Sequence, residues 1–266
     1  MDNRPVGIFD SGFGGLSALA EFRRKLPEEN ILYFGDNGRV PYGSKARDEL
    51  RTCARNNVSF LVRSGAKAVL AACGTCSLIA GDVIAGSSVP GFDVLSPSVN
   101  LIRSLPEDGP LGIIATQASI NSRGFETALR NAGLKRDIIS VPCPDFVTLI
   151  EAGFPYSDER VKKAVAEYLA PIRSAGATAL LLGCTHYGII EPSLREYLGD
   201  GVEIVSASAC GADALARQLT GSGATGGSGD VRFFTSGDPD TFRKTASVIL
   251  GYDIGDVVCI PEWENA

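Results

Sequence analysis

Two cysteines in this chain stand where apolar runs end. Cys73 follows the run in VLAACGTCS, and Cys184 follows the run in LLLGCTHYG. A segment that can form a helix comes next in each case, and a helix N-terminus favours a thiolate through its free amides and its dipole. A thiol whose pKa is lowered from about 8.5 can transfer protons near neutral pH. Either cysteine alone could be buried and serve only to pack the core. Because the two cysteines occur in matching sequence contexts, we predict that both are catalytic.

His186 is the only histidine of the chain and lies two residues after Cys184. An imidazole so placed can tune the thiol or relay its proton. A Cys/His nucleophilic hydrolase could use the same pair, so that alternative stays open at this point. A zinc site is not expected, because Cys73, Cys76, Cys184 and His186 lack the second close pair of ligands that structural sites usually show.

The run from Cys73 to Cys76 is a CxxC after an apolar run, which in isolation indicates a thioredoxin-like redox centre. The chain is far longer than one thioredoxin unit, and a redox centre leaves Cys184 unexplained. Our hypothesis is instead that a disulfide between Cys73 and Cys76 switches the enzyme off. Activity that survives full oxidation, with Cys76→Ala behaving identically, would contradict it.

Two loops carry residues that could bind an anion. The glycines of DSGFGG, residues 10–15, let backbone amides approach an anion at the start of the next helix, although Asp10 and Ser11 could also be simple caps. The loop is not a dinucleotide GxGxxG, and no GxxxxGK[ST] loop occurs, so a nucleotide is not indicated. The segment PYGSK, residues 41–45, is typical of a turn into a helix whose amides and hydroxyls can hold a carboxylate.

Short apolar runs ending in Gly, Ser or Thr alternate with amphipathic stretches, which is the βα rhythm. A first strand is expected in PVGIFD, and further strands at residues 30–34, 68–72, 111–115, 138–141, 179–182, 203–205 and 231–235. Continuously apolar strands favour a parallel sheet covered on both faces, hence a doubly wound α/β fold. Ligands bind beyond the carboxyl ends of such strands, where both cysteines lie.

The chain also repeats itself. Residues 6–9 (VGIF) are echoed by 111–114 (LGII), and GAKAVLAAC ending at Cys73 is echoed by GATALLLGC ending at Cys184. Two related halves facing each other would place equivalent strand ends on either side of one cleft. Residues 220–230 (TGSGATGGSGD) are expected to form a surface loop, followed by one more strand and helix.

Composition narrows the class of protein further. A net charge of −6 over 266 residues argues against a nucleic-acid partner. The N-terminus lacks the features of a signal peptide, and no run of about 18 apolar residues predicts a membrane span. Seven scattered cysteines fit reduced thiols better than a disulfide framework, so we expect a cytoplasmic protein without membrane contact.

Taken in order, seven motifs resemble the glutamate racemases of bacterial cell-wall synthesis: GIFDSGFGG, GDNGRVPYGSK, AACGTCS, GIIATQASINS, CPDFVTLIEAG, LLGCTHY and FFTSGD. The resemblance runs nearly end to end. It implies two pseudo-symmetric doubly wound parallel-sheet domains, 1–97 with 208–266 and 98–207, with the active site in the cleft between them. It also implies a homodimer that racemises glutamate for peptidoglycan synthesis without a metal or an organic cofactor.

The resemblance also implies roles for individual residues. Cys73 would take the proton from D-glutamate and Cys184 from L-glutamate, with Asp10 and His186 as their respective partners. Two bases agree with the chemistry, because one fixed group cannot serve both faces of the α-carbon. The residues implied in substrate binding are Ser11, Pro41, Tyr42, Gly43, Gly74, Thr75, Thr116, Ser119 and Thr185.

Gly74 departs from the family pattern, which has asparagine after the first cysteine, and Ser119 stands where the family has threonine. The missing asparagine removes a hydrogen bond worth about 0.5–1.5 kcal/mol, or up to about 3 kcal/mol if a carboxylate accepts it. Turnover could then be weak, or the substrate could be another amino acid such as aspartate. A homologue that binds without catalysis is a third possibility.

Overall fold

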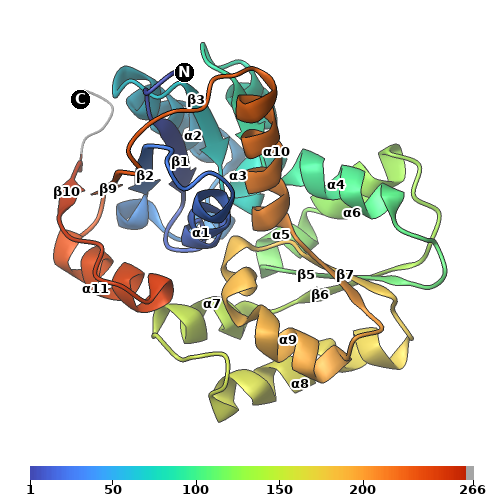
Figure 1. Cartoon of the computed structure of the whole chain (residues 1–266). Helices are drawn as coiled ribbons and strands as arrows, with labels where there is room; N and C mark the ends of the chain where they lie inside the picture. Colours follow the sequence, from blue (N-terminus) through green and yellow to red (C-terminus); the bar gives the residue numbers. More distant parts are fainter. Residues whose placement is uncertain (262–266) are drawn as a thin grey trace.

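The computed structural model describes residues 1–261, which form two parallel sheets (Figure 1). The first sheet has the order β10-β9-β2-β1-β3-β4, and the second has the order β6-β5-β7-β8. We call the parts built on them the first half and the second half. The strands are β1 Val6–Asp10, β2 Ile31–Gly35, β3 Ala68–Ala71, β4 Gly91–Asp93, β5 Leu111–Ala115, β6 Ile138–Pro142, β7 Ala179–Leu182, β8 Glu203–Ser206, β9 Val231–Thr235 and β10 Val257–Cys259.

Helices lie between most consecutive strands along the chain, as in a doubly wound α/β fold. They are α1 Leu16–Lys25, α2 Arg47–Arg63, α3 Gly74–Ala85, α4 Leu95–Ser104, α5 Gln117–Asn121, α6 Gly124–Asn131, α7 Pro144–Glu151, α8 Glu159–Ser174, α9 Glu191–Leu198, α10 Ala207–Gly221 and α11 Pro239–Leu250. Short 3-10 helices are η1 Asn37–Arg39, η2 Tyr42–Ser44 and η3 Thr185–Ile190. Within residues 1–261, no helix is long and apolar enough to cross a membrane.

The two sheets share one strand order, which agrees with the repeat in the sequence. The order β2-β1-β3-β4 corresponds to β6-β5-β7-β8, so β1 matches β5 and β3 matches β7. These are the strands whose sequences echo each other. The predicted fold class, two pseudo-symmetric parallel-sheet α/β domains, is confirmed. The boundaries at residues 97 and 207 stay a prediction.

The expected strands agree with the structure to within one residue at each end, and two short strands were missed. β4 and β10 have three residues each and are the edge strands of the first sheet, with mostly half-buried or exposed side chains. An edge strand so short carries no apolar pattern to detect. The expected surface loop at 220–230 needs a smaller correction, because α10 continues to Gly221.

The buried strands explain why the halves pack. All side chains of β1 and β3 are buried, and one apolar cluster runs from Ile8 and Leu70 of the first half to Ile113 and Leu181 of the second. α10 packs against α1 and α4 close to this junction. The C-terminal strand β9 then pairs with β2 in parallel, so the end of the chain completes the first sheet. Burial of this continuous apolar surface is what holds the halves together.

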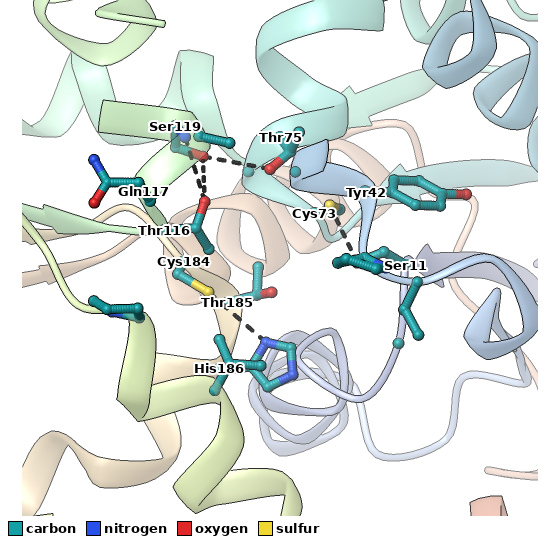
Figure 2. A pocket seen from close by; sticks show the side chains of 18 of the residues that line it. Ser11, Tyr42, Cys73, Thr75, Thr116, Gln117, Ser119, Cys184, Thr185 and His186 are labelled. Atoms are coloured by element: carbon teal, nitrogen blue, oxygen red, sulfur yellow. Dashed lines mark hydrogen bonds between the residues drawn. The ribbon is translucent and has the colours of Figure 1, made fainter. Parts of the chain in front are cut away.

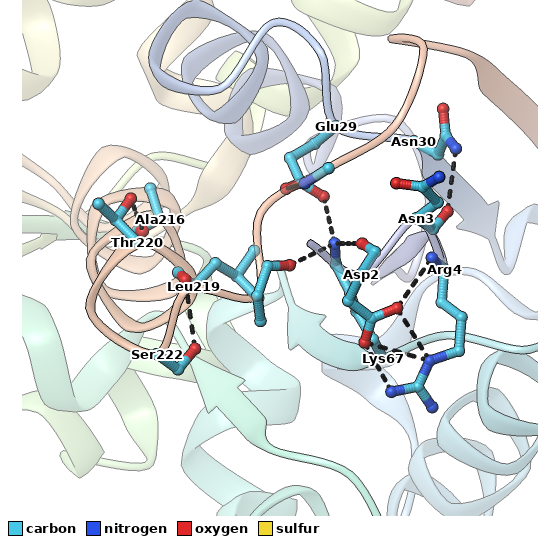
Figure 3. A network of polar contacts seen from close by, with 12 residues as sticks. Asp2, Asn3, Arg4, Glu29, Asn30, Lys67, Ala216, Leu219, Thr220 and Ser222 are labelled. Carbon is cyan, nitrogen blue, oxygen red and sulfur yellow. Dashed lines mark hydrogen bonds and ion pairs between the residues drawn. The ribbon is translucent and has the colours of Figure 1, made fainter.

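A buried ion pair lies at the end of the first sheet remote from the cysteines (Figure 3). Lys67 Nζ is 2.7 Å from Glu29 Oε2, and both side chains are 2% exposed. Lys67 also donates to the carbonyl oxygens of Asp2 (2.6 Å) and Ala224 (2.8 Å). The backbone N–H of Gly226 donates to Glu29 Oε1 at 2.8 Å. This network joins the N-terminus, the starts of β2 and β3, and the loop that leads into β9.

Candidate active site

A cavity of about 600 Å³ lies where residues of both halves meet at the carboxyl ends of their strands. The residues that the sequence indicated as catalytic or substrate-binding all line it, except Asp10: Ser11, Pro41, Tyr42, Gly43, Cys73, Gly74, Thr75, Thr116, Ser119, Cys184, Thr185 and His186. Figure 2 shows Cys73 with Ser11 on one side and Cys184 with His186 on the other. The fold therefore brings the two cysteines to one site, while their roles stay predictions.

Cys73 precedes α3 as its N-cap residue and lies two residues after the end of the buried strand β3. Its Sγ lies 3.7 Å from the Ser11 hydroxyl oxygen. Burial and the neighbouring Asp10 carboxyl raise the pKa of Cys73 to about 12, against the favourable backbone N–H of Cys76 and the Ser11 hydroxyl. The expected lowering of this pKa is therefore wrong. The amide donors at the helix N-terminus are outweighed by the loss of solvent.

Asp10 lies beneath the cavity surface and is 1% exposed. Its Oδ2 accepts a hydrogen bond from Gly12 N at 2.8 Å, and its Oδ1 accepts one from the Thr185 hydroxyl at 3.4 Å. Burial raises the pKa of Asp10, opposed by the charge of His186 and by the amides of Gly12 and Gly15. A carboxyl group with a raised pKa, close to both halves, is suited to sharing a proton with a nearby thiol.

Cys184 lies two residues after β7 and directly precedes the 3-10 helix η3, on which His186 lies. His186 Nδ1 is 3.7 Å from Cys184 Sγ, and its Nε2 is 3.0 Å from Glu151 Oε1. Burial disfavours the imidazolium, but the hydrogen bonds to Cys184 and Glu151 outweigh it and raise the pKa of His186 to about 10. The ring is therefore cationic at neutral pH and can stabilise negative charge on the sulfur.

Replacing Glu151 with glutamine is expected to lower the pKa of His186, because the imidazolium loses its anionic partner. The sole histidine makes the titration unambiguous by NMR of the untagged protein. Because its folded pKa lies above the unfolded value of about 6.5, this group stabilises the fold below pH 6.5 and loses that contribution as pH rises toward about 10. In Glu151→Gln, the pH range over which this stabilisation is lost should be narrower, because the folded pKa of His186 is lower. The exposed Glu167→Gln serves as control, and an unchanged titration in Glu151→Gln would contradict the pairing.

The loop 41–43 enters the cavity, but the hydroxyl of Tyr42 does not serve it. This hydroxyl donates to Asp36 Oδ2 at 2.6 Å and accepts from Asn57 Nδ2 at 3.0 Å, and Figure 2 shows it pointing away from the thiols. Asp36 is fully buried, and Ser236 of the β9 segment also donates to it, at 2.5 Å. The expectation that hydroxyls of this loop hold a carboxylate is therefore wrong for Tyr42, since a buried carboxyl needs its donors.

Tyr42→Phe should therefore act on stability more than on catalysis. The buried Asp36 and Asn57 side chains each lose a partner, which costs about 1–3 kcal/mol of unfolding free energy. We expect KM to change less than about threefold, since a hydroxyl bond to substrate worth about 1.4 kcal/mol would already be tenfold. Urea unfolding and steady-state kinetics measure the two effects, with the exposed Tyr156→Phe as control. A rise in KM without loss of stability would show that the hydroxyl binds substrate.

Hydroxyl groups from both halves meet on another side of the cavity. Thr75 Oγ1 of α3 lies 3.3 Å from Ser119 Oγ of α5, and Thr116 Oγ1 donates to the same Ser119 oxygen at 3.0 Å. Thr116 also caps α5 by accepting from Ser119 N. Ser119 thus keeps the hydroxyl that the family's threonine has, and these three groups can bind a charged head group of a small ligand.

The cavity also contains polar groups that sequence reasoning gave no role. Glu151 of α7 contacts His186, Cys143 lies at the start of the same helix, and Gln117 of α5 donates to Asn121 at 2.8 Å. Burial raises the pKa of Cys143, so its thiol stays protonated. The motif CPDFVTLIEAG contains both Cys143 and Glu151 and was a signal for them. Nothing in the local sequence placed this helix beside His186.

The seven cysteines all lie in the described part of the chain, and all are free. Cys76 is fully buried in the first turn of α3, and burial raises the pKa of its thiol well above the usual value. Its backbone N–H hydrogen-bonds to the Cys73 sulfur. A regulatory disulfide between Cys73 and Cys76 stays a prediction.

The fold and the site define a class, an isomerase of the racemase type with a thiol from each of two similar halves. The chain belongs to the Asp/Glu/Hydantoin racemase family, whose pattern matches residues 17–215. It is 34% identical over 263 residues to glutamate racemase 2 of Caldanaerobacter subterraneus subsp. tengcongensis, covering 98% of each chain. It is 37% identical to a glutamate racemase of Pseudomonas putida, covering 92% of this chain and 93% of the relative. The crystal structure of the Francisella tularensis glutamate racemase in complex with D-glutamate superposes with a TM-score of 0.88 at 32% identity over all of both chains.

Proposed function

We propose that this racemase interconverts L- and D-glutamate by two-base proton transfer between Cys73 and Cys184. The observation that carries the proposal is one cavity lined by a thiol from each half, each thiol next to an acid–base partner. The glutamate racemases that share about a third of its residues support glutamate as the substrate. Because one fold can carry related activities, aspartate is the substrate to compare with glutamate.

In the proposed reaction, the Asp10 carboxyl shares the proton of the Cys73 thiol, and the thiolate so formed removes the α-proton of D-glutamate, while the thiol of Cys184 returns a proton to the opposite face. The reverse reaction begins at Cys184. His186, held by Glu151, stabilises the charge on the Cys184 side, and Asp10 assists on the Cys73 side. The loop 41–43 and the hydroxyls of Thr75, Thr116 and Ser119 orient the carboxylates and the amino group. No metal or organic cofactor takes part in this scheme.

The proposal is tested by following the α-carbon of the substrate in D₂O without added cofactor. We expect deuterium incorporation with inversion from both D- and L-glutamate, seen by proton NMR and optical rotation. Faster inversion of aspartate at matched concentration would move the specificity to that amino acid. Binding without exchange would indicate a non-catalytic homologue. A burst of acyl-enzyme with an ester substrate would instead favour a Cys/His hydrolase.

We further propose that the enzyme works in the cytoplasm and that its product, D-glutamate, is used for peptidoglycan synthesis. The free state of all seven cysteines supports a reducing compartment. Loss of the gene product should then create a requirement for D-glutamate, which growth with and without it measures. Assembly as a homodimer rests on the family resemblance, and analytical ultracentrifugation of the protein tests it.

A further inference from the structure

Two glycines of the first half lie against the segment of the second half that carries Cys184. A Cβ atom built on Gly74 would be 2.5 Å from the carbonyl oxygen of Gly183. A Cβ built on Gly14 would be 2.3 Å from His186 Nδ1 and 2.4 Å from the Thr185 hydroxyl. Real Cβ contacts essentially never fall below 3.0 Å, so a Cβ at position 74 would collide with backbone, and a Cβ at position 14 would have to displace the His186 and Thr185 side chains. We call these two contacts the glycine seam.

The backbone on both sides of the Gly74 contact is held by its own sheet or helix. Gly183 N donates to Ile114 O at 2.8 Å, which ties it to β5. Ala72 N donates to Phe9 O at 2.8 Å, which ties the residue before Cys73 to β1, and Ser77 N donates to Cys73 O at 2.9 Å, which ties Cys73 to α3. A side chain at position 74 could not be accommodated locally without breaking such bonds. We therefore expect a side chain at this position to push the two halves apart.

We propose that the contact between Gly74 and the Gly183 carbonyl sets the separation of Cys73 and Cys184, an inference that rests on the proposed two-base function. Each cysteine is the immediate chain neighbour of one of the two touching residues. The α-carbon must lie within reach of both sulfurs, and a misplacement of about 1 Å can cost about a hundredfold in rate. Gly74 is thus a positioning residue that acts through the cysteines.

The contact at Gly74 changes what we expect from restoring the asparagine that the family has at this position. By the sequence, the missing asparagine is only a lost hydrogen bond to substrate. In this structure the space of its Cβ is occupied by the backbone of the opposite half, so Gly74→Asn should lower activity, not restore it. The Gly14 contact is a second point of the same seam, where the His186 ring that contacts Cys184 lies against the first half.

The test compares Gly74→Ala with Gly81→Ala, a glycine of the same helix α3 whose added Cβ would have no neighbour within 4 Å. We expect kcat of Gly74→Ala to fall about ten- to a hundredfold in both directions. KM of Gly74→Ala should change less than threefold, about as much as KM of Gly81→Ala. The α-deuterium isotope effect on kcat should increase, because proton transfer becomes rate-limiting. Gly81→Ala should retain wild-type kinetics. If Gly74→Ala does not fold, Gly14→Ala should show the same rise in isotope effect.

An unchanged kcat in Gly74→Ala, or a loss confined to KM, would overturn the inference while the wild type remains an active racemase. An unchanged isotope effect at reduced kcat would also overturn it, because it would indicate fewer active molecules rather than slower proton transfer. If the wild type and Gly81→Ala both fail to invert glutamate, the proposed function fails and the inference fails with it.

Discussion

Cys73→Ala and Cys184→Ala should each lower the rate of glutamate racemisation by about 10³-fold or more, in both directions. A correctly placed acid–base group contributes about 10²–10⁴-fold to a rate, and each turnover needs one thiol as base and the other as acid. Removing either thiol leaves one face of the α-carbon without a proton donor or acceptor. Polarimetry with each enantiomer measures the loss.

The matched control is Cys210→Ala. Cys210 and Cys184 are both 8% exposed, but Cys210 lies on α10 and does not line the cavity. Its replacement should cost some stability by removing buried atoms and leave the rate per folded molecule unchanged. If Cys73→Ala or Cys184→Ala kept near-wild-type activity, the two-base assignment would be wrong, and a single-base or nucleophilic role for the remaining cysteine would have to be considered.

The sequence could predict the two cysteines because the repeat and the strand pattern are local signals. Strands β5, β7 and β9 begin and end at the predicted residues, and each apolar run before Cys73 and Cys184 is a buried strand. Parallel strands share one carboxyl edge, so the meeting of both cysteines at one site follows from the fold class. The residues that the pattern marks are therefore also those that the structure brings together.

The remaining features depend on contacts between distant segments. Glu151 reaches His186 only because α7 packs beside η3, and the hydroxyl of Tyr42 turns to Asp36 because that carboxyl is fully buried. The pKa of Cys73 is governed by burial, which the helix-terminus argument did not include. The lack of space at Gly74 is likewise set by the opposite half. None of these contacts has a local sequence pattern.

Lys67→Met should lower the free energy of unfolding by about 3–5 kcal/mol, since it leaves the buried Glu29 carboxylate without its cation. The exposed pair of Lys162 and Glu196 is the control, because breaking an ion pair in solvent costs about 0–1 kcal/mol. Urea unfolding of Lys67→Met and Lys162→Met measures both. Equal small losses would show that the buried pair contributes no more than a surface pair.

The double variant Lys67→Met with Glu29→Leu separates the charge from the hydrogen bonds. Removing both charges should recover part of the loss, because no ion is then left buried without a partner. Recovery should stay incomplete, since the Asp2 and Ala224 carbonyls and the Gly226 N–H lose their bonds as well. Lys67 directly precedes β3, which leads to Cys73 at its other end. Loss of the network should therefore lower the temperature at which racemase activity is lost, while the kinetics of the folded enzyme remain unchanged at lower temperature.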